Sequence, residues 1–156
     1  MKPKSPRESM VEMTELVLPN DTNLLGNLLG GRLMHLVDVA GAMAAQRHSN
    51  RIVVTAAIDS VEFNHPVKQG QMITLKAKVT WVGRTSMEVA VEVFSEDFMT
   101  GERKFTNRAY LTFVAVDSSS RPVEVCKLLL ETDEDRKENE AAAIRRAERI
   151  RKKEQQ

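Results

Sequence analysis

The hydrophobic period of the chain changes once, after a long apolar segment in its first third. Residues 33–45 are nearly all Leu, Met, Val and Ala, and only His35, Asp38 and Gly41 interrupt them. A helix that is apolar on every side is normally a buried one. This segment is too short for a membrane span and contains no proline, so it predicts a single buried central helix.

Most of the later segments alternate apolar and polar residues, which is the period of a strand with one solvated face. Strands are predicted over residues 11–18, 51–63, 72–83, 86–94 and 105–117. We expect a hairpin turn over 82–86 and further turns at Gly70 and Gly101. Short connections between strands favour antiparallel pairing. The pattern therefore predicts an α+β fold in which a curved antiparallel sheet wraps a long central helix.

Composition excludes several classes of protein. The formal net charge of +1 gives no electrostatic argument for a nucleic-acid partner. The lone Cys126 excludes an internal disulfide and a Cys-rich metal site, and three scattered histidines lack the spacing of metal ligands. No apolar run approaches the roughly 20 residues of a membrane span, and the basic start lacks the apolar region of a secretion signal. We expect a soluble, cytoplasmic protein with no membrane partner.

The two ends of the chain differ from the middle. We expect a flexible start over 1–10, one domain over 11–128 and a charged helical tail over 129–156. The tail is acidic in its first half and basic in its second, which complements a helix dipole. Its apolar stripe is thin, consisting of Ala143, Ala147 and Ile150. This favours a solvated helix, with a subunit-contacting arm or a nucleic-acid contact through residues 145–153 as alternatives.

Asp38 is the one carboxylate in the central helix. Burying an unpaired carboxylate costs several kcal/mol, so Asp38 needs either a partner or a use. A structural ion pair at a subunit contact and a catalytic role both meet this need. His35 lies three residues earlier on the same helix face, so a His–Asp dyad is a further option.

Glycines and an amide precede the helix. Gly30 and Gly31 permit close backbone approach and leave free N–H groups at the positive helix end. They form either a tight turn or an oxyanion hole, which is a set of N–H donors for a carbonyl that becomes negative. Asn23 offers an amide that can hold a water or polarise a carbonyl.

Hydroxyl and guanidinium groups follow the helix. The Thr55 hydroxyl lies in an apolar stretch and needs a partner, either backbone or substrate. Arg84 and Ser86 lie in the predicted turn over 82–86. Such turns are usually solvated, but this one is chemically suited to gripping a phosphate or pantetheine.

Two long segments resemble the hotdog-fold acyl-CoA thioesterases. They are NDTNLLGNLLGGRLMHLVDVAGAMAAQRH and VTAAIDSVEFNHPVKQGQMITLKAKVTWVGRTSMEVAVEV. They look most like the bacterial single-domain acyl-CoA hydrolases related to the cytosolic and brown-fat-inducible enzymes, and the likeness covers about residues 12–125. It implies a hotdog fold and hydrolysis of fatty acyl-CoA to fatty acid and CoA, without a metal or organic cofactor. It also implies a dimer, commonly a trimer of dimers, with active sites across the subunit interface.

The resemblance also assigns roles to residues. The family's catalytic aspartate falls on Asp38, its catalytic asparagine on Asn23 and its supporting threonine on Thr55. By the dimer arrangement, Asn23 of one subunit would face Asp38 of the other, and Asn27 is the reserve for Asn23. Asp38 acts either as a general base or as a nucleophile that forms a mixed anhydride.

The remaining site predictions concern the substrate. The amide of Gly31 is expected to hold the thioester oxygen as charge develops on it. Gly30, Arg84 and Ser86 are the candidates for contacts to the substrate and its CoA moiety.

Three other functions are consistent with such a domain. A hotdog protein can sense acyl-CoA without hydrolysing it, although that leaves Asp38 and Asn23 unexplained. A hotdog dehydratase would need a histidine paired with a helix carboxylate of the partner, and only His65 lies in a suitable loop. A purely structural assembly subunit is the third possibility.

Overall fold

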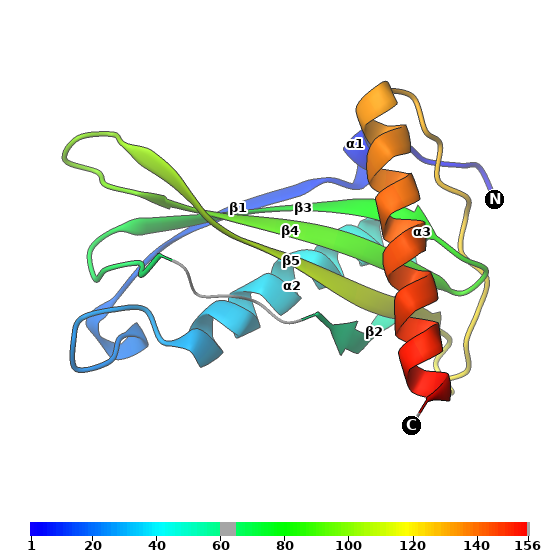
Figure 1. Ribbon diagram of the computed structural model, residues 1–156, viewed down its shortest axis with the longest axis horizontal. Coiled ribbons are helices and arrows are strands. Elements are labelled where there is room, and N and C mark those ends of the chain that lie inside the picture. Colours follow the sequence, from blue (N-terminus) through cyan, green and yellow to red (C-terminus); the bar gives the residue numbers. More distant parts are fainter. Residues whose placement is uncertain (60–64, 156) are drawn as a thin grey trace.

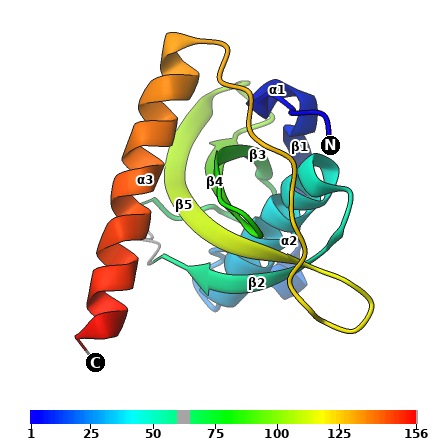
Figure 2. The same cartoon turned by 90° about the vertical axis from the view of Figure 1, so that its right-hand side faces the viewer.

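The computed structural model of the protein describes residues 1–59 and 65–155. In this part of the chain, five strands form one antiparallel sheet in the order β1-β3-β4-β5-β2, which curls around the helix α2 (Figures 1 and 2). The strands are β1 (Val11–Leu16), β2 (Ile52–Ile58), β3 (Met72–Val82), β4 (Ser86–Glu96) and β5 (Arg103–Val116). The helices are α1 (Pro6–Ser9), the short 3-10 helix η1 (Pro19–Asp21), α2 (Gly30–Ser49) and α3 (Asp133–Glu154). The predicted α+β architecture is confirmed.

The turns lie where the sequence places them. β3 and β4 are joined through residues 83–85, as the predicted hairpin requires. Gly70 and Gly101 have φ values of +86° and +74°, a left-handed conformation that favours glycine. Of the strand predicted over 51–63, the structure has Ile52–Ile58, and residues 60–63 lie outside the described residues.

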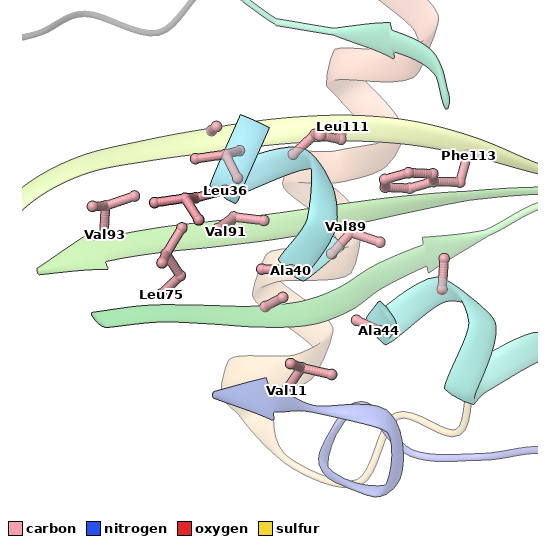
Figure 3. Close-up of a cluster of buried hydrophobic side chains, with 14 of the residues drawn as sticks. Val11, Leu36, Ala40, Ala44, Leu75, Val89, Val91, Val93, Leu111 and Phe113 are labelled. Carbon is pink, nitrogen blue, oxygen red and sulfur yellow. The ribbon is translucent and has the colours of Figure 1, made fainter. Parts of the chain in front are cut away.

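The core lies between α2 and the concave face of the sheet. Leu36, Ala40 and Ala44 of α2 lie among Val89, Val91, Leu111 and Phe113 of β4 and β5, and all are buried (Figure 3). Gly41 allows the helix to approach closely, since a Cβ there would lie 3.1 Å from the Phe113 ring. This packing fixes the position of α2, and therefore of Asp38, against the sheet.

The prediction that α2 is buried on all sides is wrong for the single chain. Leu33, Val37 and Ala40 are buried, whereas His35 is exposed and Asp38 is only half-buried. The reason is that the sheet curls around one side of the helix and ends at the edge strand β2 (Figure 2). Asp38 lies on the side of α2 that the sheet leaves open.

The first ten residues, expected to be flexible, contain α1 and contact the rest of the fold. Ser5, Pro6 and Ser9 are buried. Lys4 forms backbone hydrogen bonds with Lys127 and Leu129, and its Nζ donates to Asn50 Oδ1 at 2.6 Å. The short run 1–10 has few apolar residues, so its pattern does not reveal these polar contacts.

The C-terminal helix α3 lies across the convex face of the sheet and is not simply solvated (Figures 1 and 2). Its contacting residues are largely polar: Asn139 Nδ2 donates to the carbonyl of Thr80, and Arg145 binds Glu88 of β4. Ala142 is fully buried, while Ile144 and Ile150 are exposed. The expected stripe of Ala143, Ala147 and Ile150 is therefore not the side of α3 that packs.

Hydrogen bonds also define the start of α3. The Thr132 hydroxyl accepts from the Asp135 N–H, while Asp135 Oδ2 accepts from the N–H groups of Glu131 and Thr132. Burial alone would raise the pKa of Asp135, but these backbone hydrogen bonds outweigh it and lower the pKa. This capping box sets where the helix begins.

The end of α2 is held by a buried histidine. His48 is fully buried, and its Nε2 lies 2.9 Å from the Cys126 carbonyl and 3.4 Å from the Cys126 Sγ. Burial lowers the pKa of His48, although the hydrogen bond to the Cys126 carbonyl opposes this. The folded protein therefore favours the neutral imidazole.

We expect the free energy of unfolding to fall as the pH drops below about 6.5, the ordinary pKa of histidine. Below that value the unfolded chain binds a proton that the folded protein binds less well, so stability is fully present above it. One such group changes the free energy by at most about 1.4 kcal/mol per pH unit. Urea denaturation of the wild type and His48→Gln between pH 5 and pH 8 measures this. The same slope in both proteins would contradict the assignment to His48.

Candidate functional site

Asp38 and Thr55 meet on the open side of α2. The Thr55 hydroxyl donates a hydrogen bond of 2.8 Å to Asp38 Oδ1. Thr55 lies in the edge strand β2, and its strand neighbour in β5 is Phe113. The exposed His35 makes no hydrogen bond to Asp38 within the described part of the chain. The pair that forms is therefore Asp–Thr, and the optional His–Asp dyad does not form in this structure.

The N-terminus of α2 offers free backbone donors. Leu29 is the N-cap residue and has no side chain that can accept a hydrogen bond there. Among residues 1–59 and 65–155, the amides of Gly30 and Gly31 donate to no protein group, whereas Leu33 N–H bonds to the Leu29 carbonyl. Gly31 is exposed. The helix start therefore presents unsatisfied N–H groups at its positive end.

The Asn23 side chain shapes the loop before α2. Its Oδ1 accepts from the Leu25 N–H at 2.9 Å and the Asn27 N–H at 3.1 Å. Because both of these partners are donors, the side-chain atom that faces them is the amide oxygen and not the nitrogen. Asn23 is exposed, and its Nδ2 makes no hydrogen bond within the described residues. Asn23 can therefore donate to a ligand but its oxygen is already used. The loop and Asp38 make no hydrogen bond to each other in the single chain.

Arg32 and Asp21 hold this loop, and neither was predicted as part of the site. Arg32 pairs with Asp21 at 3.3 Å and with Glu15 of β1 at 3.2 Å. The Asp21 carbonyl also accepts from the Leu29 N–H at 2.9 Å. The sequence signal that could have identified this ion pair is the presence of opposite charges, Asp21 and Arg32, on either side of Gly30 and Gly31.

A pocket of about 240 Å³ adjoins the helix start. It is lined by Asn27, Gly30, Leu33 and the loop 65–67 with Leu28. Asn27, the reserve for Asn23, uses its backbone N–H and carbonyl to close the loop with Asn23. Gly30 thus lies both at the helix start and at this pocket.

Arg84 and Ser86 lie elsewhere in the single chain. Arg84 is exposed in the β3–β4 turn, and its carbonyl accepts from the Val125 N–H. Ser86 shares a cavity with Glu88 and residues of α3, on the face of the sheet opposite to α2. One chain therefore does not bring Arg84 and Ser86 to Asp38.

Two further observations concern other kinds of site. Within the described residues, no three His, Cys, Asp or Glu side chains are grouped closely enough to hold a metal ion. No helix of those residues combines the length and apolar character needed to cross a membrane.

Comparisons of sequence place the chain among known proteins. Residues 25–102 match the family model described as Thioesterase superfamily. The acyl-CoA thioester hydrolase YkhA of Bacillus subtilis is 44% identical over 147 residues, which cover 94% of this chain and 86% of YkhA.

Solved structures agree with this. A hexameric acyl-CoA thioesterase without ligand superposes with a TM-score of 0.92 at 40% identity, covering 97% of each chain. The acyl-CoA hydrolase of Staphylococcus aureus, in complex with butyryl-CoA, CoA and CoA disulfide, has a TM-score of 0.86 at 34% identity and covers 98% of this chain and 96% of that one. Structures of the S. aureus enzyme also exist with an aspartate, an asparagine or a threonine replaced by alanine.

Proposed function

Since the chain belongs to the Thioesterase superfamily and is an acyl-CoA thioester hydrolase, we propose that Asp38, Asn23 and the amide of Gly31 carry out the hydrolysis. The observation that carries the proposal is the 2.8 Å hydrogen bond by which Thr55 orients Asp38 on the open side of α2. The products are a fatty acid and free CoA.

The S. aureus variants support this choice of residues. In that enzyme the replaced asparagine precedes the replaced aspartate by 15 residues, and the threonine follows the aspartate by 17. Asn23, Asp38 and Thr55 have the same two spacings. The chain thus carries the same three residue types in the same register.

Asp38 acts as the general base in this mechanism. Because Thr55 occupies Oδ1, Oδ2 is left to take a proton from the attacking water. The N–H of Gly31 receives the thioester oxygen as it becomes negative, and a donor of this kind is worth about 3 kcal/mol. Direct attack by Asp38, which forms a mixed anhydride, uses the same geometry.

The site is completed by a second copy of the chain. β2 is an edge strand, and its Ile52 and Val54 are 58% and 46% exposed. Leu24 and Leu25, next to Asn23, are also exposed. Burying the exposed residues of β2 and the two leucines beside Asn23 against a second copy of the chain stabilises a dimer. In such a dimer Asn23 of one subunit donates from Nδ2 to the thioester held at Asp38 of the other, and a trimer of dimers would give the hexamer seen in the related enzyme.

The proposed activity is tested by release of free thiol from a series of acyl-CoA substrates. We expect turnover by the purified protein without added metal or organic cofactor. If no acyl-CoA chain length gives thiol release above the uncatalysed rate, the protein binds acyl-CoA without hydrolysing it or serves another role.

Asn23→Asp tests the donor role of the amide. The aspartate keeps the oxygen that the Leu25 and Asn27 amides need, but it lacks Nδ2 and adds charge near the developing oxyanion. We expect kcat/KM to fall about 100-fold, since loss of one such donor costs about 2.7 kcal/mol or more, with little change in Tm. Asn20→Asp, in the exposed 3-10 helix η1 that precedes the Asn23 loop, is the matched control. Equal activity of the two variants would show that Asn23 only shapes the loop.

A further inference from the structure

We propose that the cavity between the C-terminal half of α3 and the convex face of the sheet binds a free fatty acid. The carboxylate lies among the basic side chains of α3, and the alkyl chain lies on the sheet. The cavity has a volume of about 380 Å³, within the range of roughly 300–1,000 Å³ that small-molecule sites have. It is a second site, on the face of the sheet opposite to α2 and Asp38, and the proposed hydrolysis does not depend on it.

The wall of the cavity that α3 contributes is strongly basic. Its charged members are Arg146, Arg149, Lys152 and Lys153, and Ile150 lies among them. Positions 146, 149, 150 and 153 are three or four residues apart, so they share one side of the helix. Like charges at this spacing repel one another. An anion bound between them relieves the repulsion.

The carboxylates of the described residues do not balance these cations. Glu88 lines the cavity, but it is 1% exposed and already lies 2.8 Å from Arg145 and 3.7 Å from Arg149. Within the described part of the chain, no ion pair is formed by the other three cations, which are Arg146, Lys152 and Lys153. The cavity therefore carries an excess of positive charge, which a negatively charged ligand complements.

The sheet supplies an apolar floor. The register of β2 shifts between Thr55 and Ala57, and this bulge lets the consecutive residues Ala56 and Ala57 both line the cavity. Regular alternation would turn one of the two alanines to the other face of the sheet. Trp81 of β3 and Ile150 of α3 add further apolar surface. An alkyl chain is stabilised when it leaves water for such a surface.

The meeting of these two surfaces selects the ligand. They join at Trp81, where the Arg146 guanidinium lies 4.7 Å from the centre of the ring. A small anion such as phosphate would use the cations but leave the floor in water, and an uncharged alkyl chain would leave the cations without a partner. A fatty acid offers a carboxylate for charge-assisted hydrogen bonds and an alkyl chain for the floor. Acyl-CoA hydrolysis releases this class of molecule beside the protein.

The test uses the single tryptophan of the chain, Trp81, which lines the cavity and so reports its occupancy by fluorescence. The protein is titrated with decanoate in the absence of acyl-CoA. We expect a saturable change with one decanoate bound per chain. 1-Decanol, which has the same chain without the charge, should bind at least about tenfold more weakly. Inorganic phosphate, which has charge but no chain, should not displace decanoate.

Lys153→Glu should raise the Kd for decanoate at least about fivefold, because it replaces a cation of the cavity wall with an anion. Arg151→Glu is the matched control: it makes the same change of charge at an exposed position two residues earlier that does not line the cavity, and should alter the Kd less than about twofold. A wild-type Kd in Lys153→Glu, equal affinity for 1-decanol, displacement by phosphate, or no saturable binding would each overturn the inference. Absence of thiol release with every acyl-CoA would instead refute the proposed function and leave this titration unaffected.

Discussion

Asp38→Asn is expected to lower kcat for acyl-CoA hydrolysis by about 1,000-fold while leaving the fold intact. A positioned general base typically contributes 100- to 10,000-fold, and an amide cannot take a proton from water. The asparagine can still accept the Thr55 hydrogen bond through its oxygen, so the contact between α2 and β2 is kept. Thiol release under saturating substrate measures the loss of rate.

Two measurements make this result specific. The Tm and the oligomeric state of Asp38→Asn should match those of the wild type, because Asp38 is half-buried and the core residues of α2 are unchanged. Thr55→Val removes only the orienting hydroxyl and should cost less, about tenfold in kcat. Wild-type turnover by a folded Asp38→Asn protein would mean that the carboxylate is structural, as in the ion-pair alternative.

The alternating segments made most of the fold predictable. The Val- and Met-rich runs after residue 70 specify strands because a period of two places one apolar face on the core. The apolar helix was also predicted correctly, but the sequence did not predict that one side of it is left uncovered by the sheet. A sequence cannot show how far a sheet curls, so the half-exposure of Asp38 emerged only from the edge position of β2.

The candidate site was predictable in part. The hydrogen bond between Asp38 and Thr55 joins two residues that the resemblance to thioesterases had assigned, and the Gly31 N–H donates to no group among the residues that the structure describes. The use of the Asn23 side-chain oxygen within its own loop was not predictable, because it depends on two backbone N–H groups that turn toward that oxygen.

The packing of α3 was the largest feature that hydrophobic patterning could not predict. In the alternating strand over 86–94, Glu88 has the parity of the solvated face. In the structure it is 1% exposed, because the polar side of α3 covers it. A buried ion pair adds no apolar residue to either element, so it leaves no hydrophobic signal.

Arg145→Ala is expected to lower the free energy of unfolding by about 3 kcal/mol. Arg145 binds Glu88 through two hydrogen bonds of 3.1 and 2.8 Å, and its guanidinium lies 3.6 Å from the centre of the Tyr110 ring. Removing one partner leaves a buried charge uncompensated, which costs about 3–5 kcal/mol. The lower end applies because Thr80 still donates to Glu88 and Arg149 lies 3.7 Å from it. A loss of this size lowers Tm by roughly 6–12 °C.

The neighbouring Arg151→Ala supplies the comparison, because Arg151 is exposed and forms no ion pair within the described residues. Its Tm should change by less than about 2 °C, since surface substitutions away from buried networks have small effects. The double variant Glu88→Leu, Arg145→Met should recover most of the stability, because an apolar pair of similar volume replaces the buried charges. If Arg145→Ala and Arg151→Ala unfold at the same temperature, the ion pair does not hold α3 on the sheet, and the contacts of Asn139 and Ala142 must do so.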